Sequence, residues 1–251
     1  MLEAHPLDAV RELDGARNVG VLVPPANPVV EPELNRLLPG ALRLFAARLP
    51  VMPDTTLEER NRRYIGAYAE TLGSFGSLAL DAVVIGLTGP CYRLLPAGDR
   101  EVAASLSRLG RPVQTASGAI LDALHALSAR RLCLLSPYPK WLTDHAAAYW
   151  TAAGHEVVDI VTVSETHDAY ALTSRQVEAA LRRVRTSSVD AIVMSGTGML
   201  TLPAILASRS TLALPFLSSN ICCAWWLMRA TGALQPSPVF AAAAPELASR
   251  P

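Results

Sequence analysis

One segment of this chain nearly occurs twice. Residues 80–90 read LDAVVIGLTGP, and residues 189–199 read VDAIVMSGTGM. Each copy is an apolar run of strand length that ends in a small, glycine-containing loop. This pattern is typical of a buried parallel strand whose carboxyl end reaches a binding crevice. Two such ends predict one site shared by two halves of the chain.

A second pair of segments favours an internal duplication. Residues 20–24 (GVLVP) and 133–137 (CLLSP) are both apolar runs closed by proline, separated by 113 residues, and Asp190 follows Asp81 by 109 residues. Chance similarity is the alternative, because buried parallel strands resemble one another. Two segments that match in the same order favour a duplicated α/β half.

Apolar runs alternate with stretches of helical periodicity. The clearest helix follows Thr56, where Thr56 and Glu59 have the spacing of a capping box, and another begins at Thr173 with Gln176. Strands are expected near residues 19–24, 42–48, 82–86, 112–115, 131–136, 156–162, 190–194 and 212–217. This alternation predicts parallel sheets with helices on both faces.

The expected fold is therefore α/β, with two pseudo-symmetric parallel-sheet domains and the site between them. The expected parts are an N-terminal extension over residues 1–18, a first α/β half over 19–115 plus 212–231, a second α/β half over 116–211, and a loosely held C-terminal tail over 232–251.

Composition excludes several classes of function. The 251 residues are 51% hydrophobic and 18% charged, which is enough for a substantial core. Lys plus Arg equals Asp plus Glu at 22 each, so no global field favours nucleic acid or an anionic membrane. No apolar stretch reaches the roughly 18 residues of a spanning helix, and the first residues lack a signal pattern. We expect a cytoplasmic protein without nucleic-acid or membrane partners, and a homo-oligomer is compatible with the sequence.

The chain has four cysteines, at Cys91, Cys133, Cys222 and Cys223. None has Cys-x-x-Cys spacing, which argues against a metal site or a redox motif. Cys133 lies in an apolar strand and the adjacent pair opens an apolar helical stretch, so packing roles are expected for these three. Only Cys91, just beyond the first glycine loop, is placed where reactivity matters.

Polar residues at the expected strand ends are candidate anion ligands. Asn27 follows the first strand in a proline-rich turn, and Tyr138 lies between two prolines at a helix start. Their alternatives are an N-cap for Asn27 and an interfacial aromatic role for Tyr138. The repeated loops add hydroxyl and backbone N–H groups suited to carboxylate or phosphate, at Thr88, Gly89, Ser195, Gly196, Thr197 and Gly198.

Thr115 and Ser117 lie at a further strand end and supply two more hydroxyl groups. The alternative for Ser117 is capping of the helix that follows. The sequence contains neither a phosphate-binding Gly-x-x-x-x-Gly-Lys-Ser/Thr element nor a Gly-x-Gly-x-x-Gly after the first strand. Nucleotide cofactors are therefore not expected.

Together these elements resemble maleate cis-trans isomerases and arylmalonate decarboxylases, members of the aspartate/glutamate racemase superfamily. The resemblance covers roughly residues 19–230. It rests on residues 23–33 (VPPANPVVEPE), on the Ser-Pro-Tyr element that ends at Tyr138 and on the Thr-Ala-Ser-Gly run at 115–118. It implies a pair of aspartate racemase-like domains, a small carboxylate substrate, and no metal or organic cofactor.

The resemblance also implies a cysteine at the end of each repeated strand, of which the decarboxylases keep only the second. The matching positions here are Leu87, before Thr88, and Gly196, before Thr197. In this superfamily the thiol transfers a proton or adds to the substrate, which neither leucine nor glycine can do. The chain therefore departs from the superfamily at the positions that carry its chemistry.

What the resemblance carries over is a carboxylate cradle made of Asn27, Thr88, Tyr138 and Thr197 with neighbouring backbone N–H groups. Another group has to transfer the proton. The candidates are Cys91, turning into the site from its loop, Tyr92, Ser195, and His167 in the loop after a strand. The alternatives are a buried, inert cysteine and a surface histidine. The expected catalytic residues are Tyr138, Cys91, Thr88 and Thr197.

Two classes of function are consistent with this pattern. The first is a metal- and cofactor-independent lyase of the decarboxylase type or isomerase that works through an enolate or oxyanion, with a hydrolase step at the same anion site as a variant. The second is a non-catalytic protein that binds small carboxylates. The intact donors favour the enzyme, and the missing cysteines keep the second class open.

Overall fold

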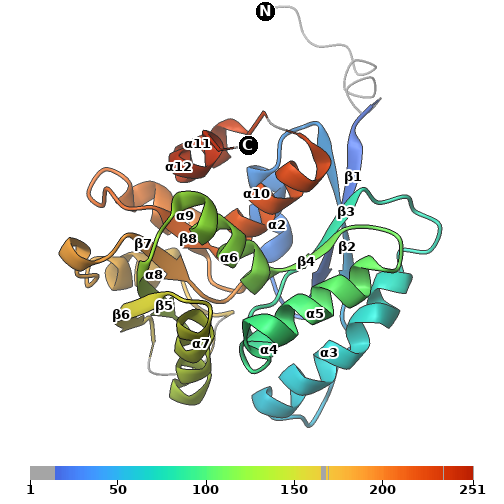
Figure 1. Cartoon of the computed structure of the whole chain (residues 1–251), viewed down its shortest axis with the longest axis horizontal. Helices are drawn as coiled ribbons and strands as arrows, with labels where there is room; N and C mark the ends of the chain where they lie inside the picture. The colour runs from blue at the N-terminus through green and yellow to red at the C-terminus, as the bar shows by residue number, and fades with distance from the viewer. Residues whose placement is uncertain (1–14, 165–167, 169, 234, 251) are drawn as a thin grey trace, which may run out of the picture.

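Two parallel sheets of four strands each form the frame of the protein (Figure 1). The structure is a computed structural model that describes residues 15–164, 168, 170–233 and 235–250. The first sheet has the order β2-β1-β3-β4, with β1 (Arg17–Val23), β2 (Leu42–Arg48), β3 (Ala82–Ile85) and β4 (Val113–Thr115). The second has the order β6-β5-β7-β8, with β5 (Arg131–Ser136), β6 (Glu156–Thr162), β7 (Ala191–Met194) and β8 (Phe216–Ser218). All eight expected strands are confirmed, as is the α/β class.

The two sheets repeat one topology. In each, the first strand of the half pairs with the second on one side and the third on the other, with Val19 opposite Ala82 in β3 and Leu132 opposite Ala191 in β7. A carboxylate precedes each third strand. Asp81 accepts the N–H of Asn18 at 2.9 Å, and Asp190 accepts the N–H of Arg131 at 2.9 Å. The repeated sequence therefore forms equivalent structure in both halves.

Helices fill the intervals between strands. Their bounds are α2 (Val30–Leu37), α3 (Leu57–Gly73), α4 (Gly89–Tyr92), α5 (Leu95–Ser107), α6 (Ala116–Leu127), α7 (Lys140–Ala152), α8 (Ser174–Leu181), η1 (Thr186–Ser188), α9 (Thr201–Ser208), α10 (Ser219–Thr231), α11 (Pro238–Ala243) and α12 (Pro245–Ala248). Thr56 caps α3 by accepting the N–H of Glu59, and Thr173 forms a full capping box with Gln176 at α8. Both helix starts agree with the sequence pattern.

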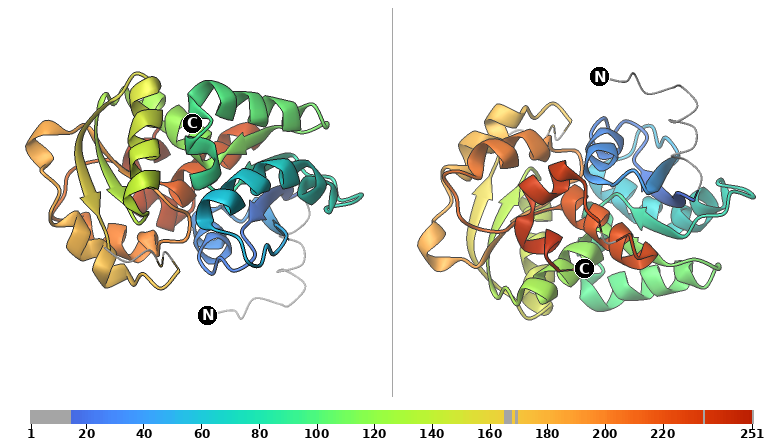
Figure 2. Two further views of the ribbon diagram at one scale, coloured as in Figure 1. Left: turned by 90° about the horizontal axis from the view of Figure 1, so that it is seen from below. Right: turned by 90° about the horizontal axis from the view of Figure 1, so that it is seen from above.

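Helices α6 and α10 join the halves. They pack against each other, and α10 also contacts α2 and β3 of the first half, whereas α6 contacts both β4 and β8 (Figure 2). Ile120 of α6 and Ile221 of α10 are completely buried in a hydrophobic core that includes strands of both sheets. The two halves therefore share one continuous core.

Three boundaries expected from the sequence are wrong. The strand expected at 212–217 with the first half is β8, which pairs with β7 at the edge of the second sheet. The N-terminal extension ends earlier than residue 18, because Arg17 and Asn18 already pair with β2. The C-terminal segment is not loosely held, since Phe240 and Leu247 of α11 and α12 are buried. These contacts join residues that are far apart in the sequence, so no local sequence pattern predicts them.

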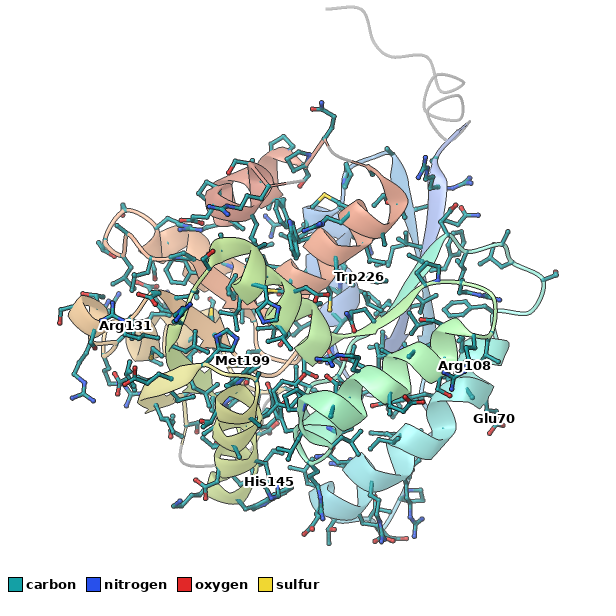
Figure 3. All side chains as sticks on the ribbon, viewed as in Figure 1. Glu70, Arg108, Arg131, His145, Met199 and Trp226 are labelled. Atoms are coloured by element: carbon teal, nitrogen blue, oxygen red, sulfur yellow. The ribbon has the colours of Figure 1, made fainter. Side chains whose placement is uncertain are left out.

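Side chains follow the expected division between surface and interior. Glu70, Arg108 and Arg131 are exposed at the periphery, whereas Met199 is fully buried (Figure 3). No helix within the described residues has the length and apolar character needed to span a membrane.

Candidate active site

A cavity of about 220 Å³ lies where carboxyl ends of strands from both sheets meet. The loops after β1, β3, β5 and β7 supply its floor, α3 supplies one wall, and two residues between β6 and α8 supply another. The lining residues are Pro24, Leu57, Arg60, Asn61, Tyr64, Leu87, Thr88, Gly89, Pro90, Tyr138, Leu142, Asp168, Tyr170, Gly196, Thr197 and Gly198. The cavity has the position expected for a ligand site in parallel α/β sheets.

Tyr138 and Thr88 form a direct link between the halves at this cavity. Their hydroxyl oxygens lie 2.7 Å apart, and the backbone N–H of Gly196 donates to the Thr88 hydroxyl at 3.3 Å. Burial raises the pKa of the Tyr138 phenol, so the side chain stays protonated at neutral pH. A neutral phenol in the cavity wall is a hydrogen-bond donor for an anion.

Asn27 and Thr197 form a second link, but their side chains are already occupied. The Asn27 amide donates to the Thr197 hydroxyl at 3.2 Å, and that hydroxyl donates to the carbonyl of Gly86 at 2.8 Å. The Asn27 carbonyl accepts the N–H of Val29 at 2.9 Å and so caps the turn before α2. Asn27 is not among the lining residues, so the expectation that its side chain is a direct ligand donor is corrected: it holds the loop backbones in place. Thr197 does line the cavity, with its hydroxyl already bonded to Gly86.

The backbone offers the free donors. Among the described residues, the N–H groups of Thr88, Thr197 and Gly198 make no hydrogen bond to a backbone carbonyl. All three residues line the cavity. Buried N–H groups without a protein partner need a ligand or water, and such groups at strand ends form anion-binding concavities.

Two glycines shape the floor. Gly196 has φ +89°, and a Cβ there would lie 2.8 Å from Pro137 and 3.4 Å from the Tyr138 hydroxyl. At Gly198 a Cβ would lie 2.5 Å from the ring of Tyr170. The positive φ and the Pro137 ring therefore require glycine at position 196, and a side chain at position 198 would displace the ring of Tyr170. Leu87, at the other position where the resemblance implies cysteine, lines the cavity with an apolar side chain.

Cys91 does not line the cavity, contrary to the expectation that its thiol turns into the site. It lies fully buried on α4. Burial, followed by the neighbouring carboxylate of Asp99, raises the pKa of its thiol well above the ordinary value. Asp99 also accepts hydrogen bonds from Thr115 at 2.9 Å and Tyr149 at 2.7 Å. The thiol belongs to a buried polar cluster behind the cavity and is not a nucleophile poised for substrate.

Thr115 and Ser117 belong to the same region behind the cavity and do not line it. Both are completely buried, and Thr115, not Ser117, caps α6 by accepting the N–H of Gly118 at 2.9 Å. The expectation that these two hydroxyl groups bind substrate is therefore corrected. Their positions follow from the close packing of α6 on the first sheet.

Tyr92 and Ser195 pair with each other, with 2.6 Å between their hydroxyl oxygens. Both side chains are buried and neither residue lines the cavity. Burial raises the pKa of Tyr92, which keeps the phenol neutral. His167 lies outside the described residues. Among the described residues, no group of three or more His, Cys, Asp or Glu side chains is arranged to hold a metal ion.

The sequence interpretation missed the α3 wall and the two residues that face it. Leu57, Arg60, Asn61 and Tyr64 line the cavity from α3, at intervals of one helical turn. Leu57 and Tyr64 belong to the apolar periodicity of this helix, and polar residues between them on the same face are the signal that a site lies there. Asp168 and Tyr170 precede α8, and no sequence pattern marked them.

Comparisons with known proteins identify a family and a shared fold. The family model described as arylmalonate decarboxylase matches residues 19–240. A maleate isomerase of Nocardia farcinica is 29% identical over 228 residues, covering 86% of this chain and 90% of that protein.

Two solved structures share the fold. The maleate isomerase Iso from Pseudomonas putida S16 has a TM-score of 0.83 at 23% identity, with 90% of this chain and 96% of that chain covered. A cysteine-to-serine variant of Nocardia farcinica maleate cis-trans isomerase, with a covalently bound succinylcysteine intermediate, has a TM-score of 0.77 at 24% identity, with 94% and 100% covered.

Proposed function

Because the chain belongs to the arylmalonate decarboxylase family, we propose that it is a cofactor-independent enzyme that acts on a small carboxylate through an enolate- or oxyanion-stabilising site. The proposed reaction is decarboxylation of an activated malonate-type acid or isomerisation of an unsaturated diacid, with proton-transfer residues other than cysteine.

The observation that carries this proposal is the junction of the two strand-end loops. Thr88 of the first half touches the Tyr138 hydroxyl and the Gly196 N–H of the second, and these loops also present the N–H groups of Thr197 and Gly198, which make no backbone hydrogen bond within the described residues. Donors that are fixed before the ligand arrives stabilise negative charge without reorganisation. Each such donor lowers the activation free energy by roughly 3 kcal/mol when it points at the developing charge.

In this site a substrate carboxylate accepts hydrogen bonds from the backbone N–H groups of Thr88, Thr197 and Gly198 and from the Tyr138 hydroxyl. In decarboxylation, the bond between the α-carbon and the departing carboxylate breaks and carbon dioxide leaves. The electron pair of that bond stays with the α-carbon and delocalises onto the retained carboxylate, which forms an enediolate. The same donors hold that charge. The protonated phenol of Tyr138 lies in the wall and supplies the proton to carbon, with solvent restoring it.

Decarboxylation is favoured over isomerisation by one observation. The Nocardia farcinica isomerase structure contains a succinylcysteine intermediate, whereas no cysteine is among the described residues that line this cavity. Addition to an alkene needs a nucleophile of that kind. Enolate chemistry needs only charge stabilisation and a proton donor, both of which the lining residues provide.

The test is turnover in deuterated buffer without added metal or cofactor. The full chain is incubated with malonates, maleate and hydroxy acids, and proton NMR follows carbon dioxide loss, isomerisation and deuterium incorporation at the α-carbon. We expect at least one substrate to be transformed. Tyr138→Phe is expected to lower kcat by about 10²- to 10³-fold, the usual effect of losing one such donor.

Tyr149→Phe is the matched control. It also removes one buried phenol hydroxyl, but that hydroxyl bonds Asp99 behind the cavity and Tyr149 does not line it. Its turnover should equal that of the wild type at a temperature where both are folded. Saturable binding of these acids without turnover or deuterium incorporation would instead identify a non-catalytic carboxylate-binding protein.

A further inference from the structure

The loop after β7 is held to the rest of the molecule at the backbone of Thr197. The carbonyl of Thr197 accepts a hydrogen bond from the side-chain amide of Asn220, on α10, at 3.3 Å. The hydroxyl of Thr197 is held separately, by the Asn27 amide and the carbonyl of Gly86. None of these contacts uses a backbone N–H group of the loop.

The geometry of the peptide bond connects the Asn220 contact to the cavity. The carbonyl of Thr197 and the N–H of Gly198 belong to one planar trans peptide, so the two groups point in opposite directions. Gly198 lines the cavity, and its N–H makes no backbone hydrogen bond within the described residues. The bond from Asn220 on one side of this peptide therefore fixes the direction of the N–H on the other side.

The preceding peptide is fixed within the loop itself. Its carbonyl, on Gly196, accepts the N–H of Met199 at 3.4 Å, so its N–H, on Thr197, points the other way. The peptide between Thr197 and Gly198 is held instead by a side chain from another helix. The direction of one cavity donor thus depends on a residue that does not line the cavity.

A buried carboxylate fixes the Asn220 amide in turn. The amide nitrogen carries two hydrogens, and it donates to Oε2 of Glu33 at 2.8 Å as well as to Thr197. Turning the amide over would place its oxygen against that carboxylate and that carbonyl, so one orientation is favoured. Glu33 is itself held by the Thr201 hydroxyl and the Leu202 N–H. The contacts therefore run from α2 through α10 to the cavity loop.

Packing alone does not explain an asparagine at position 220. The residue is 1% exposed, and its amide oxygen has no hydrogen-bond partner among the described residues, which lowers stability. The equivalent residue of the first half is Ser117, since each lies two residues after the cap of its helix. Within the part of the chain that the structure describes, the Ser117 hydroxyl bonds no carbonyl of the loop that holds Thr88. The duplicated fold therefore does not require this contact.

We propose that Asn220 is a positioning residue for the reaction, with Glu33 as its support, because holding the Thr197 carbonyl aims the Gly198 N–H at the bound carboxylate or enediolate. The inference rests on the proposed function in taking the ligand of this N–H to be a carboxylate. A donor displaced by about 1 Å loses much of its effect on developing charge, at a cost of up to about 10²-fold in rate.

The test observes the loop by NMR in the full chain labelled with nitrogen-15 and carbon-13, with propionate as the probe. In the wild type, propionate should shift the amide signals of Gly198 and Thr88. Asn220→Leu has a side chain of similar size and removes both donors. Without ligand it should move the carbonyl-carbon signal of Thr197. With propionate it should reduce the shift of Gly198 severalfold and leave that of Thr88.

Turnover of the substrate found in the deuterium assay gives a second measurement. Asn220→Leu should lower kcat by about tenfold or more and change KM less, because the contribution of the Gly198 N–H grows as negative charge develops. Glu33→Gln keeps the shape of the side chain and weakens its hold on the Asn220 amide. It should produce the same changes to a smaller extent, and it tests the inference even where Asn220→Leu does not fold.

Thr201→Val is the matched control. It removes a hydrogen bond of 2.9 Å to the same oxygen of Glu33, from a residue as buried as Asn220, and leaves the Thr197 carbonyl bonded. Its thermal stability should fall, whereas its Gly198 response and its kcat should equal those of the wild type at a temperature where both are folded.

The outcomes separate this inference from the proposed function. If Asn220→Leu and Glu33→Gln respond to propionate and turn over as Thr201→Val does, both residues only stabilise the fold and the inference is wrong, while the cradle stands. A lower kcat with an unchanged Gly198 response overturns it as well. If propionate shifts no loop amide in the wild type and Tyr138→Phe keeps full turnover, the carboxylate site of the proposed function is misplaced and the inference fails with it.

Discussion

Tyr138 and Thr88 illustrate what single residues contribute to this site. Each is held by its own strand-end loop, and the 2.7 Å contact between their hydroxyl oxygens forms only when the two halves pack together. The sequence identified both as anion donors from their place after apolar strands. Their pairing, and the raised pKa that burial imposes on Tyr138, depend on the tertiary structure.

The cysteines lead to the first prediction. All four are buried, and burial raises the pKa of the thiols of Cys91, Cys222 and Cys223, so little thiolate forms at neutral pH. The native protein should therefore react with Ellman's reagent far more slowly than the unfolded chain, which releases four equivalents. Cys91→Ser should keep its turnover.

Leu87→Cys is the positive control for this experiment, because Leu87 lines the cavity. The new thiol should react in the native protein and be protected by a bound carboxylate. One equivalent of rapid reaction in the native wild type, abolished by Cys91→Ser, would show instead that Cys91 is accessible.

Asp190 gives a prediction about pH. The backbone N–H of Arg131 lowers the pKa of this carboxyl to about 2, helped by the N–H of Arg130. A lowered pKa means that the stabilisation is complete above the unfolded value near 3.8 and is lost as the pH falls towards 2. Asp190→Asn should lower the free energy of unfolding by about 1–2 kcal/mol at pH 7 and by less near pH 2.

Urea denaturation at several pH values measures the difference between this variant and the wild type. Asp81→Asn is the matched substitution in the first half, where the carboxylate accepts the N–H of Asn18. If Asp190→Asn lowers the free energy of unfolding by the same amount at pH 7 and at pH 2, the stabilisation does not depend on the ionised carboxylate.

At the scale of elements, α2 is tied to α9 and α10 by one buried carboxylate. Glu33 accepts the Thr201 hydroxyl at 2.9 Å, the Leu202 N–H at 2.7 Å and the Asn220 amide at 2.8 Å. It therefore satisfies donors at the first turn of α9 as a capping residue would, but from a distant helix. The sequence run that contains Glu33 was noted only as part of a resemblance.

Glu33→Ala should lower the free energy of unfolding by about 2–3 kcal/mol, because several buried donors lose their acceptor. Burial raises the pKa of Glu33 above 4.5 despite these donors. Its contribution to stability is thus complete below pH 4.5 and declines as the pH rises through the raised value. The difference between wild type and variant should be larger near pH 4.5 than near pH 7.5 in chemical denaturation.

Glu31→Ala is the control on the same helix, where the carboxylate pairs with Arg48 at the surface. Such a pair contributes about 0–1 kcal/mol, so this variant should remain close to the wild type. A Glu33→Ala difference that grows as the pH rises would contradict the direction of the pKa shift.

At the scale of the whole molecule, the C-terminal helices complete the core that joins the halves. Phe240 of α11 is fully buried, and α11 contacts both α2 and α9. Phe240→Ala should lower the free energy of unfolding by about 3–5 kcal/mol, the usual cost of an aromatic cavity, and both halves should unfold in one transition. Far-ultraviolet circular dichroism during urea unfolding measures both the free energy of unfolding and the number of transitions.

Val239→Ala is the matched control, since Val239 is the neighbour of Phe240 in α11, is only partly buried at the edge of the core, and loses fewer atoms on truncation. It should cost less than about 1 kcal/mol. A Phe240→Ala loss as small as that of Val239→Ala would mean that the C-terminal segment is loosely held, as the sequence alone suggested.

The strands and their duplicated order along the chain were predictable because a buried parallel strand has a local sequence pattern, a run of apolar residues followed by glycine or proline. The same local pattern identified the loop residues Thr88, Gly89, Gly196, Thr197 and Gly198, all of which line the cavity. Cap chemistry likewise identified the starts of α3 and α8, because it joins residues three positions apart.

Only the tertiary structure decided which of these side chains face the ligand. Asn27, Cys91, Thr115, Ser117 and Ser195 have suitable chemistry and suitable positions along the chain, yet packing places them behind the cavity wall. The cavity-lining role of the α3 residues could not be predicted from the sequence. A polar residue on a helix has the same local sequence whether it faces solvent or the opposite half of the protein. The repeated strand ends are a local property of the sequence, whereas the cavity depends on long-range packing.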